Sequence, residues 1–133
     1  MTRYVLDTSA VLAYFWQEPG WERVADLLAG KNHAISSVNL AELVGKARLE
    51  GMPKAAVPEM LAALELDVHP FDEVQALACG LLQPSTRPAG LSLGDRACLA
   101  LAQSLGAIAV TADRPWLTLD LGVRVECIRP AAA

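Results

Sequence analysis

The chain has 133 residues, 53% of them hydrophobic, and it carries a formal net charge of −4 at neutral pH. This length predicts one compact domain over residues 1–133. The acidic balance argues against a protein that holds nucleic acid on a broad basic surface, but it leaves open an enzyme whose carboxylates hold a cation.

Neither a membrane span nor a secretory signal is predicted. The longest apolar stretch, residues 97–112, is interrupted by Gln103, Ser104 and Gly106, which leaves it short of the roughly 20 apolar residues that cross a bilayer. The first residues run directly into a strand-like segment, without the long apolar region of a signal peptide. We therefore expect a cytoplasmic protein.

Hydrophobic periodicity and helix-stop residues predict strands that alternate with helices. The first half is expected to contain a strand over 3–7, helices over 9–17 and 21–29, a strand over 33–36 and helices over 38–50 and 53–64. The second half is expected to contain a strand over 67–71, a helix over 72–83, a loop over 84–90, a helix over 92–105, strands over 107–110 and 123–128, and a loose tail over 130–133. This alternation predicts an α/β domain with a mainly parallel sheet.

Four acidic residues fall at predicted strand ends or helix starts. Asp7 closes the first strand, and Glu42 lies early in the helix that follows the second strand. Asp95 lies in the first turn of the 92–105 helix, and Asp113 follows the 107–110 strand. Because working groups of parallel α/β folds gather at the carboxyl ends of the strands, these side chains are candidates for one site.

Each acid also has an ordinary structural interpretation. Asp7 is placed to cap the following helix, and Asn39 with Glu42 resembles a capping pair. The segment from Ser92 to Asp95 matches a capping box, and residues 111–113 match a side-chain turn. The set as a whole is harder to explain in this way, because converging carboxylates repel one another unless a cation such as Mg²⁺ or Mn²⁺ lies between them.

Four segments resemble, in order, the signature blocks of PIN-domain proteins, most closely the VapC-type toxins of bacterial toxin–antitoxin pairs. They are Tyr-Val-Leu-Asp-Thr-Ser-Ala at 4–10, Ser-Val-Asn-Leu-Ala-Glu-Leu at 37–43, Leu-Ser-Leu-Gly-Asp-Arg-Ala at 91–97 and Val-Thr-Ala-Asp-Arg-Pro-Trp at 110–116. The resemblance implies a three-layer α/β/α fold and metal-dependent hydrolysis of RNA phosphodiester bonds. It carries the catalytic acids onto Asp7, Glu42, Asp95 and Asp113.

The resemblance also implies roles within the site. Asp7 and Asp95 are expected to bind Mg²⁺ directly, with Mn²⁺ as an alternative, and Asp113 to bind it directly or through water. Glu42 is expected to be a further ligand or to orient the attacking water. The family's hydroxyl positions fall on Thr8 or Ser9 and on Thr111, and we expect Ser9 and Thr111 to hold carboxylates or waters.

For partners, the resemblance implies an RNA substrate, a small VapB-like antitoxin and a homodimer. Two alternatives remain open, a PIN domain that acts in RNA maturation and a catalytically silent PIN interaction module. A haloacid dehalogenase phosphatase is disfavoured because it requires an acid where this chain has Ser9. A response-regulator receiver is disfavoured because it requires an acidic pair before its first helix and a lysine late in the chain, and neither is evident in this sequence.

The remaining polar and aromatic candidates are assigned mainly structural roles. Arg96 and Arg114 adjoin two of the acids, so contact with RNA phosphate and local charge balance are both open. Lys46 is expected to pair with Glu42 four residues earlier or to face solvent. A place in the core is expected for the large aromatic residues Phe15, Trp16, Trp21 and Trp116, and structural roles are expected for His33 and His69.

Overall fold

The structure is a computed structural model that describes residues 2–129. Its five strands pair in parallel, in the order β3-β2-β1-β4-β5. The strands are β1 (Tyr4–Leu6), β2 (His33–Ser36), β3 (Val68–His69), β4 (Ile108–Thr111) and β5 (Val125–Cys127). The helices are α1 (Thr8–Phe15), α2 (Trp21–Ala29), α3 (Ser37–Leu49), α4 (Val57–Leu64), α5 (Glu73–Leu81), α6 (Gln83–Thr86) and α7 (Leu93–Leu105).

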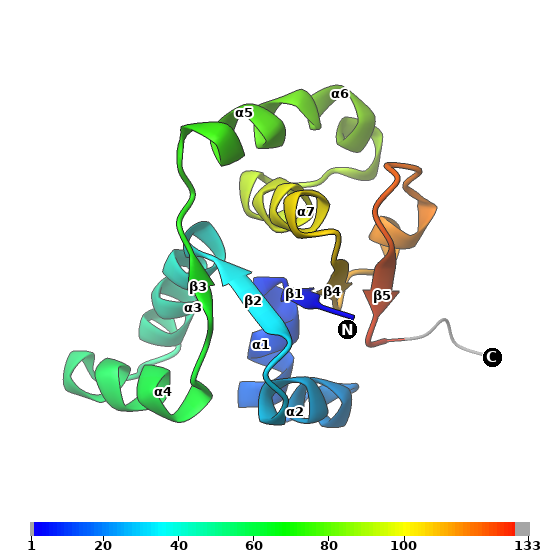
Figure 1. Cartoon of the computed structure of the whole chain (residues 1–133). Coiled ribbons are helices and arrows are strands. Elements are labelled where there is room, and N and C mark those ends of the chain that lie inside the picture. The colour runs from blue at the N-terminus through cyan, green and yellow to red at the C-terminus, as the bar shows by residue number, and fades with distance from the viewer. Residues whose placement is uncertain (1, 130–133) are drawn as a thin grey trace.

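Helices cover both faces of the sheet. In Figure 1, α5, α6 and α7 lie on one side, and α1 and α2 lie on the other. Successive side chains of a strand point to opposite faces. Accordingly, Leu6 and Val110 belong to the core that packs against α1 to α4, while Val5 and Ala109 belong to the core around α7. The expected three-layer α/β/α arrangement with a parallel sheet is confirmed.

The register of the sheet brings three chain segments to one edge. Leu6 of β1 is paired with Val110 of β4, and Val5 is paired with Ala34 of β2. Just beyond this pairing, the backbone N–H of Asp7 donates to the carbonyl of Val110 at 2.8 Å. The residues that follow β1, β2 and β4 therefore lie close together at the carboxyl edge of the sheet.

Several predicted elements need correction. The stretch 84–90 was expected as a loop, but it contains the end of α6 and a 3₁₀ turn over Arg87–Ala89. Pro84 is compatible with the first turn of a helix. The helix expected over 53–64 begins as a 3₁₀ turn at Lys54–Ala56, and a further 3₁₀ turn over Arg114–Thr118 was not predicted. The tail over 130–133 lies outside the described residues.

Three strands, β1, β3 and β5, are shorter than predicted, most clearly β3, which has two residues instead of five. The strand β2 spans the predicted residues, and β4 has the predicted length but begins one residue later. Among residues 2–129, no helix is long and apolar enough to cross a membrane.

Two predictions about aromatic residues have different outcomes. Trp116 is 1% exposed and belongs to the core around α7, as expected. Phe15 and Trp16 were also expected in the core, but they are 37% and 40% exposed at the end of α1. His33 is buried and has the structural role expected, since its ring nitrogens lie 3.2 Å from the carbonyls of Gly30 and Glu65.

Candidate active site

Asp7 is a buried residue at the end of β1, and 2% of it is exposed. It occupies the N-cap position of α1, but it makes no side-chain capping bond, so the capping interpretation is wrong for this residue. Its Oδ2 atom instead accepts hydrogen bonds from Ser9 Oγ at 2.6 Å and Thr111 Oγ1 at 3.2 Å. The two hydroxyls that were expected to hold a carboxylate both contact this one.

Burial is the main cause that raises the pKa of Asp7 to about 7. The hydrogen bonds from Ser9 and Thr111 oppose this shift, while the negative charges of Asp95 and Glu42 increase it. A buried carboxylate with these neighbours is costly to keep ionised without a positive charge. The position of Asp7 therefore favours a bound proton or a bound cation.

Glu42 lies on α3, with a half-buried side chain that neighbouring polar groups hold in place. Its Oε1 atom accepts hydrogen bonds from Thr8 Oγ1 at 2.8 Å and Asn39 Nδ2 at 3.1 Å. The cap of α3 is Ser36, whose Oγ accepts from the Val38 N–H at 3.2 Å. The interpretation of Asn39 and Glu42 as a capping pair is therefore wrong, and both side chains are turned toward the carboxyl edge of the sheet.

Asp95 lies in the first turn of α7 and does form the expected capping box. Its Oδ2 atom accepts from the Ser92 N–H at 2.9 Å, and its own N–H donates to Ser92 Oγ at 3.2 Å. Burial raises the pKa of Asp95, the bonds from Ser92 lower it, and the charges of Asp113 and Glu42 raise it further. Asp95 therefore has a structural role and also belongs electrostatically to the acidic cluster.

Asp113 is the most peripheral of the four acids. Its side chain is exposed, and its N–H donates to Thr111 Oγ1 at 3.1 Å, which forms the expected side-chain turn. Thr111 thus contacts both Asp113 and Asp7. This shared threonine links the turn after β4 to the end of β1.

The four predicted acids influence one another electrostatically, since Asp95 and Glu42 raise the pKa of Asp7, and Asp113 and Glu42 raise the pKa of Asp95. Within residues 2–129, none of the ion pairs involves Asp7, Glu42, Asp95 or Asp113. Of the two alternatives for Lys46, the pair with Glu42 is absent from the same part of the chain, and Lys46 is exposed to solvent. Excess negative charge therefore remains at the carboxyl edge of the sheet.

The donor set fits a hard divalent cation in its chemistry, since carboxylate and hydroxyl oxygens are the groups that Mg²⁺ and Mn²⁺ prefer. Among the described residues, however, no group of three or more acidic, histidine or cysteine side chains is close enough to hold an ion as placed. Asp95 turns one oxygen to Ser92. Rotation of such carboxylates toward a common point is needed before three of them share a metal ion.

Three residues at this edge were not predicted as site residues of their own. Asn39 is fully buried, and its Nδ2 atom lies within 3.4 Å of Asp7 Oδ1 and 3.0 Å of the Gly94 carbonyl. Thr8 was considered only as an alternative to Ser9, and its hydroxyl contacts Glu42. Gly94 lies against the Glu42 carboxylate, which a Cβ atom at position 94 would overlap. The spacing of Asn39 three residues before Glu42 was the available signal.

The two arginines beside the acids contact backbone groups instead. Arg96 donates from Nη1 to the Cys79 carbonyl at 3.3 Å, and Arg114 donates from Nε to the Arg129 carbonyl at 3.2 Å. Contact of either guanidinium with RNA phosphate stays a prediction.

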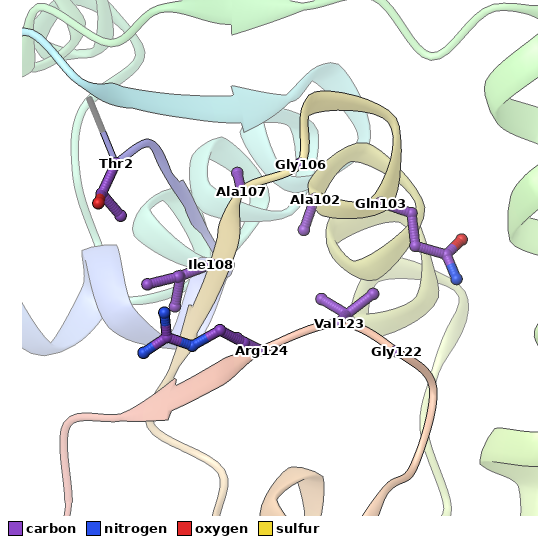
Figure 2. A pocket seen from close by; sticks show the side chains of 9 residues that line it. All are labelled: Thr2, Ala102, Gln103, Gly106, Ala107, Ile108, Gly122, Val123 and Arg124. Atoms are coloured by element: carbon purple, nitrogen blue, oxygen red, sulfur yellow. The ribbon is translucent and has the colours of Figure 1, made fainter.

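A cavity of about 520 Å³ lies at the opposite edge of the sheet, at the amino ends of β4 and β5. Figure 2 shows Arg124 and Ile108 on one side of this cavity, with Gln103 and Val123 from α7 and the approach to β5 on the other. Among residues 2–129, Arg124 is the charged residue that lines it, and none of the four acids does. This cavity is therefore separate from the candidate site.

The fold and the acidic edge define a parallel α/β protein with carboxylates clustered at its strand ends. The PIN domain family matches residues 4–120, and the chain belongs to this family. The family that the four sequence blocks resemble is thereby confirmed. No curated protein matches the chain.

Solved structures with the same fold include chains of VapBC and FitAcB. A chain of DNA-bound VapBC from Salmonella typhimurium is 22% identical with a TM-score of 0.74, and the match covers 96% of this chain and 99% of that one. A chain of FitAcB from Neisseria gonorrhoeae is 22% identical with a TM-score of 0.72, covering 94% and 97%. A chain of VapBC-5 from Mycobacterium tuberculosis is 25% identical with a TM-score of 0.62, covering 98% and 100%.

Proposed function

We propose that this PIN domain is a Mg²⁺-dependent or Mn²⁺-dependent endoribonuclease and the toxin of a VapBC-type pair. The observation that carries the proposal is the buried Asp7 carboxylate, which is surrounded by acidic neighbours and has no ion pair within residues 2–129. Membership of the PIN family and likeness to chains of VapBC complexes support the same function.

In this proposal the acidic residues have different roles in binding a metal ion and orienting a water molecule. Asp7 and Asp95 bind the cation directly, and Asp113 binds it directly or through water. Glu42 is a further ligand or orients the attacking water. When bound, the divalent ion polarises phosphoryl oxygens and lowers the pKa of water. Ser9 and Thr111 fix the Asp7 carboxylate through their hydroxyl groups.

The direct test is cleavage of a panel of RNAs with Mg²⁺ or Mn²⁺ by the wild-type chain, Asp7→Asn and Asp95→Asn. Each substitution removes one negative charge with little change in volume, and we expect cleavage to fall at least about 100-fold. Asp26→Asn, at an exposed position on α2, is the matched control and is expected to cleave normally. Equal cleavage by all four proteins, or cleavage that survives a chelator, contradicts the proposal.

The toxin role is tested separately from the chemistry. Expression of the wild-type chain alone is expected to arrest growth, and co-expression of a neighbouring small protein with a basic tail is expected to relieve the arrest. Harmless expression of a protein that cleaves RNA in vitro would favour the alternative role in RNA maturation. Harmless expression of a folded protein that neither binds metal nor cleaves RNA would favour a silent interaction module.

A homodimer is part of the same proposal, and α5 offers a surface for it. Val74, Leu77 and Leu81 are 71%, 67% and 72% exposed along this helix. Apolar side chains grouped on one helix often mark an interface. We expect Leu77→Glu to be monomeric by light scattering, while Leu49→Glu, at an 87% exposed position on α3, stays dimeric. A dimeric Leu77→Glu protein contradicts this location.

A further inference from the structure

Asn39 is the polar residue at the carboxyl edge whose contacts join the most segments. It lies in the first turns of α3 and is fully buried. Its Nδ2 atom lies within hydrogen-bonding distance of Asp7 Oδ1, Thr8 Oγ1, Glu42 Oε1 and the Gly94 carbonyl, at 3.4, 3.2, 3.1 and 3.0 Å. One side-chain amide therefore connects the end of β1, the start of α1, the inner side of α3 and the first turn of α7.

All four of these contacts place the amide nitrogen near oxygen atoms. The amide donates hydrogen bonds to carboxylates but brings no positive charge, unlike a lysine or an arginine. It therefore reduces the cost of bringing Asp7 and Glu42 together and leaves their negative charge in place for a cation.

The oxygen of the Asn39 amide indicates that the surrounding acids impose the orientation in which the nitrogen faces them. Asn39 Oδ1 is buried and has no hydrogen-bond partner within the described residues. An unsatisfied buried acceptor destabilises the folded state, and such groups are uncommon in folded proteins. Reversing the amide would place this oxygen next to the carboxylates of Asp7 and Glu42. The observed orientation gives up one bond so that the nitrogen faces the acids.

Gly94 completes this arrangement from the side of α7. Its carbonyl accepts the shortest of the four contacts of Asn39 Nδ2, at 3.0 Å. Its missing side chain leaves the space that the Glu42 carboxylate occupies, since a Cβ atom there would overlap all three carboxylate atoms. Asp95 is the next residue along α7, so the position of Gly94 also determines where Asp95 lies relative to Glu42.

We propose that Asn39 is a positioning residue, which holds the carboxylates of Asp7 and Glu42 in place and ties them, through Gly94, to the helix turn that carries Asp95. This inference rests on the proposed metal-dependent cleavage, because it assigns Asn39 a part in the same site. Asn39 acts through the carboxylates and does not bind the cation or the RNA itself.

The test measures Mn²⁺ affinity by calorimetry and RNA cleavage for Asn39→Leu, which keeps the volume and removes the amide. Loss of a group that orients metal ligands typically costs 10- to 100-fold in affinity or activity. We expect a fall of about this size in Mn²⁺ affinity and in kcat, with KM for RNA nearly unchanged. Asn39→Thr keeps a hydrogen-bond donor and is expected to retain more Mn²⁺ affinity than Asn39→Leu.

Gln75→Leu is the matched control for the loss of a buried amide. Gln75 lies on α5, and its Nε2 atom donates to Ser104 Oγ at 3.1 Å, away from the acids. Both leucine variants are expected to change thermal stability, because each removes a buried hydrogen bond. Only Asn39→Leu is expected to lose Mn²⁺ affinity, so the comparison separates positioning of the acids from support of the fold.

Gly94→Ala tests the same arrangement without touching Asn39, and it remains decisive if Asn39→Leu does not fold. The added Cβ is expected to displace the Glu42 carboxylate and lower Mn²⁺ affinity about tenfold. Gly80→Ala, on α5 with open space around it, is the control and is expected to bind Mn²⁺ normally.

Failure of the positioning role and failure of the proposed function give different results. Wild-type Mn²⁺ affinity and kcat in Gly94→Ala and in any folded Asn39→Leu protein would overturn the positioning role and leave the proposed function intact. Failure of the wild-type chain to bind Mn²⁺ or cleave any RNA would overturn the proposed function itself.

Discussion

The two edges of the parallel sheet differ in what they offer a ligand. The amino edge has a cavity of about 520 Å³ whose lining includes Arg124. The carboxyl edge crowds Asp7, Glu42 and Asp95 closely enough that Glu42 and Asp95 each raise the pKa of Asp7. Cavity volume and chemical function are therefore separate properties, because unbalanced buried charge indicates a functional site more specifically than the volume of a cavity does.

Removing the hydroxyl of Ser9 is expected to have an effect as large as that of Asn39→Leu. Ser9 Oγ donates to Asp7 Oδ2 at 2.6 Å and accepts from the Ala112 N–H at 2.9 Å, so it fixes Asp7 against the turn after β4. Ser9→Ala is expected to lower the RNA cleavage rate about 10- to 100-fold. Ser85→Ala, at an exposed position of α6, is the control. Normal cleavage by Ser9→Ala would mean that Asp7 needs no such support.

A smaller effect is expected on the stability of the metal-free protein. The pKa of Asp7 is about 7 in the folded chain, whereas an unfolded aspartate has a pKa near 3.9. The folded state therefore binds the proton more tightly, and stability from this group is lost as the pH rises from about 4 through 7.

The measurement that checks this effect is the melting temperature of the wild-type protein relative to Asp7→Asn, in the presence of a chelator, between pH 5 and pH 8. The relative stability of the wild type is expected to fall with rising pH by on the order of 1–4 kcal/mol, or several degrees. Saturating Mn²⁺ is expected to stabilise the wild type at pH 8. A melting-temperature difference independent of pH contradicts the raised pKa of Asp7.

The smallest effect belongs to the amino edge. Arg124→Ala changes the charged residue of the cavity in Figure 2 and leaves the acidic edge intact. We expect its rate of RNA cleavage and its Mn²⁺ affinity to equal those of the wild type. A clear loss of cleavage in this variant would show that RNA also contacts the amino edge and would remove the contrast between the two edges.

The sequence predicted the order of the main strands and helices well, because apolar strands such as β1 and β4 alternate with helices that end at glycines. It was less successful where short-range signals conflict. Pro84 and the prolines near it favoured a loop, although proline fits the first turn of α6. The strand predicted over 67–71 was too long, since β3 has two residues. Pairing at the edge of a sheet depends on tertiary contacts as well as on local preference.

The candidate site was predictable to the extent that strand ends can be read from hydrophobic patterns. The acidic residues and the hydroxyls of Ser9 and Thr111 follow from that reading and from the resemblance to PIN domains. Asn39 was interpreted as part of a cap, because its contact with Gly94 joins residues 55 positions apart. No local pattern indicates such a contact, and the open space beside Gly94 becomes apparent only when α3 and α7 are packed together.

The central claim is that the carboxyl edge of the sheet binds a divalent cation through Asp7. Calorimetric titration of the folded protein with Mn²⁺ at pH 8, comparing the wild type with Asp7→Asn, tests this claim most directly. The account predicts saturable binding by the wild type and at least about a 100-fold loss of affinity in Asp7→Asn. Equal affinity in the two proteins, or no binding by the wild type, would contradict it.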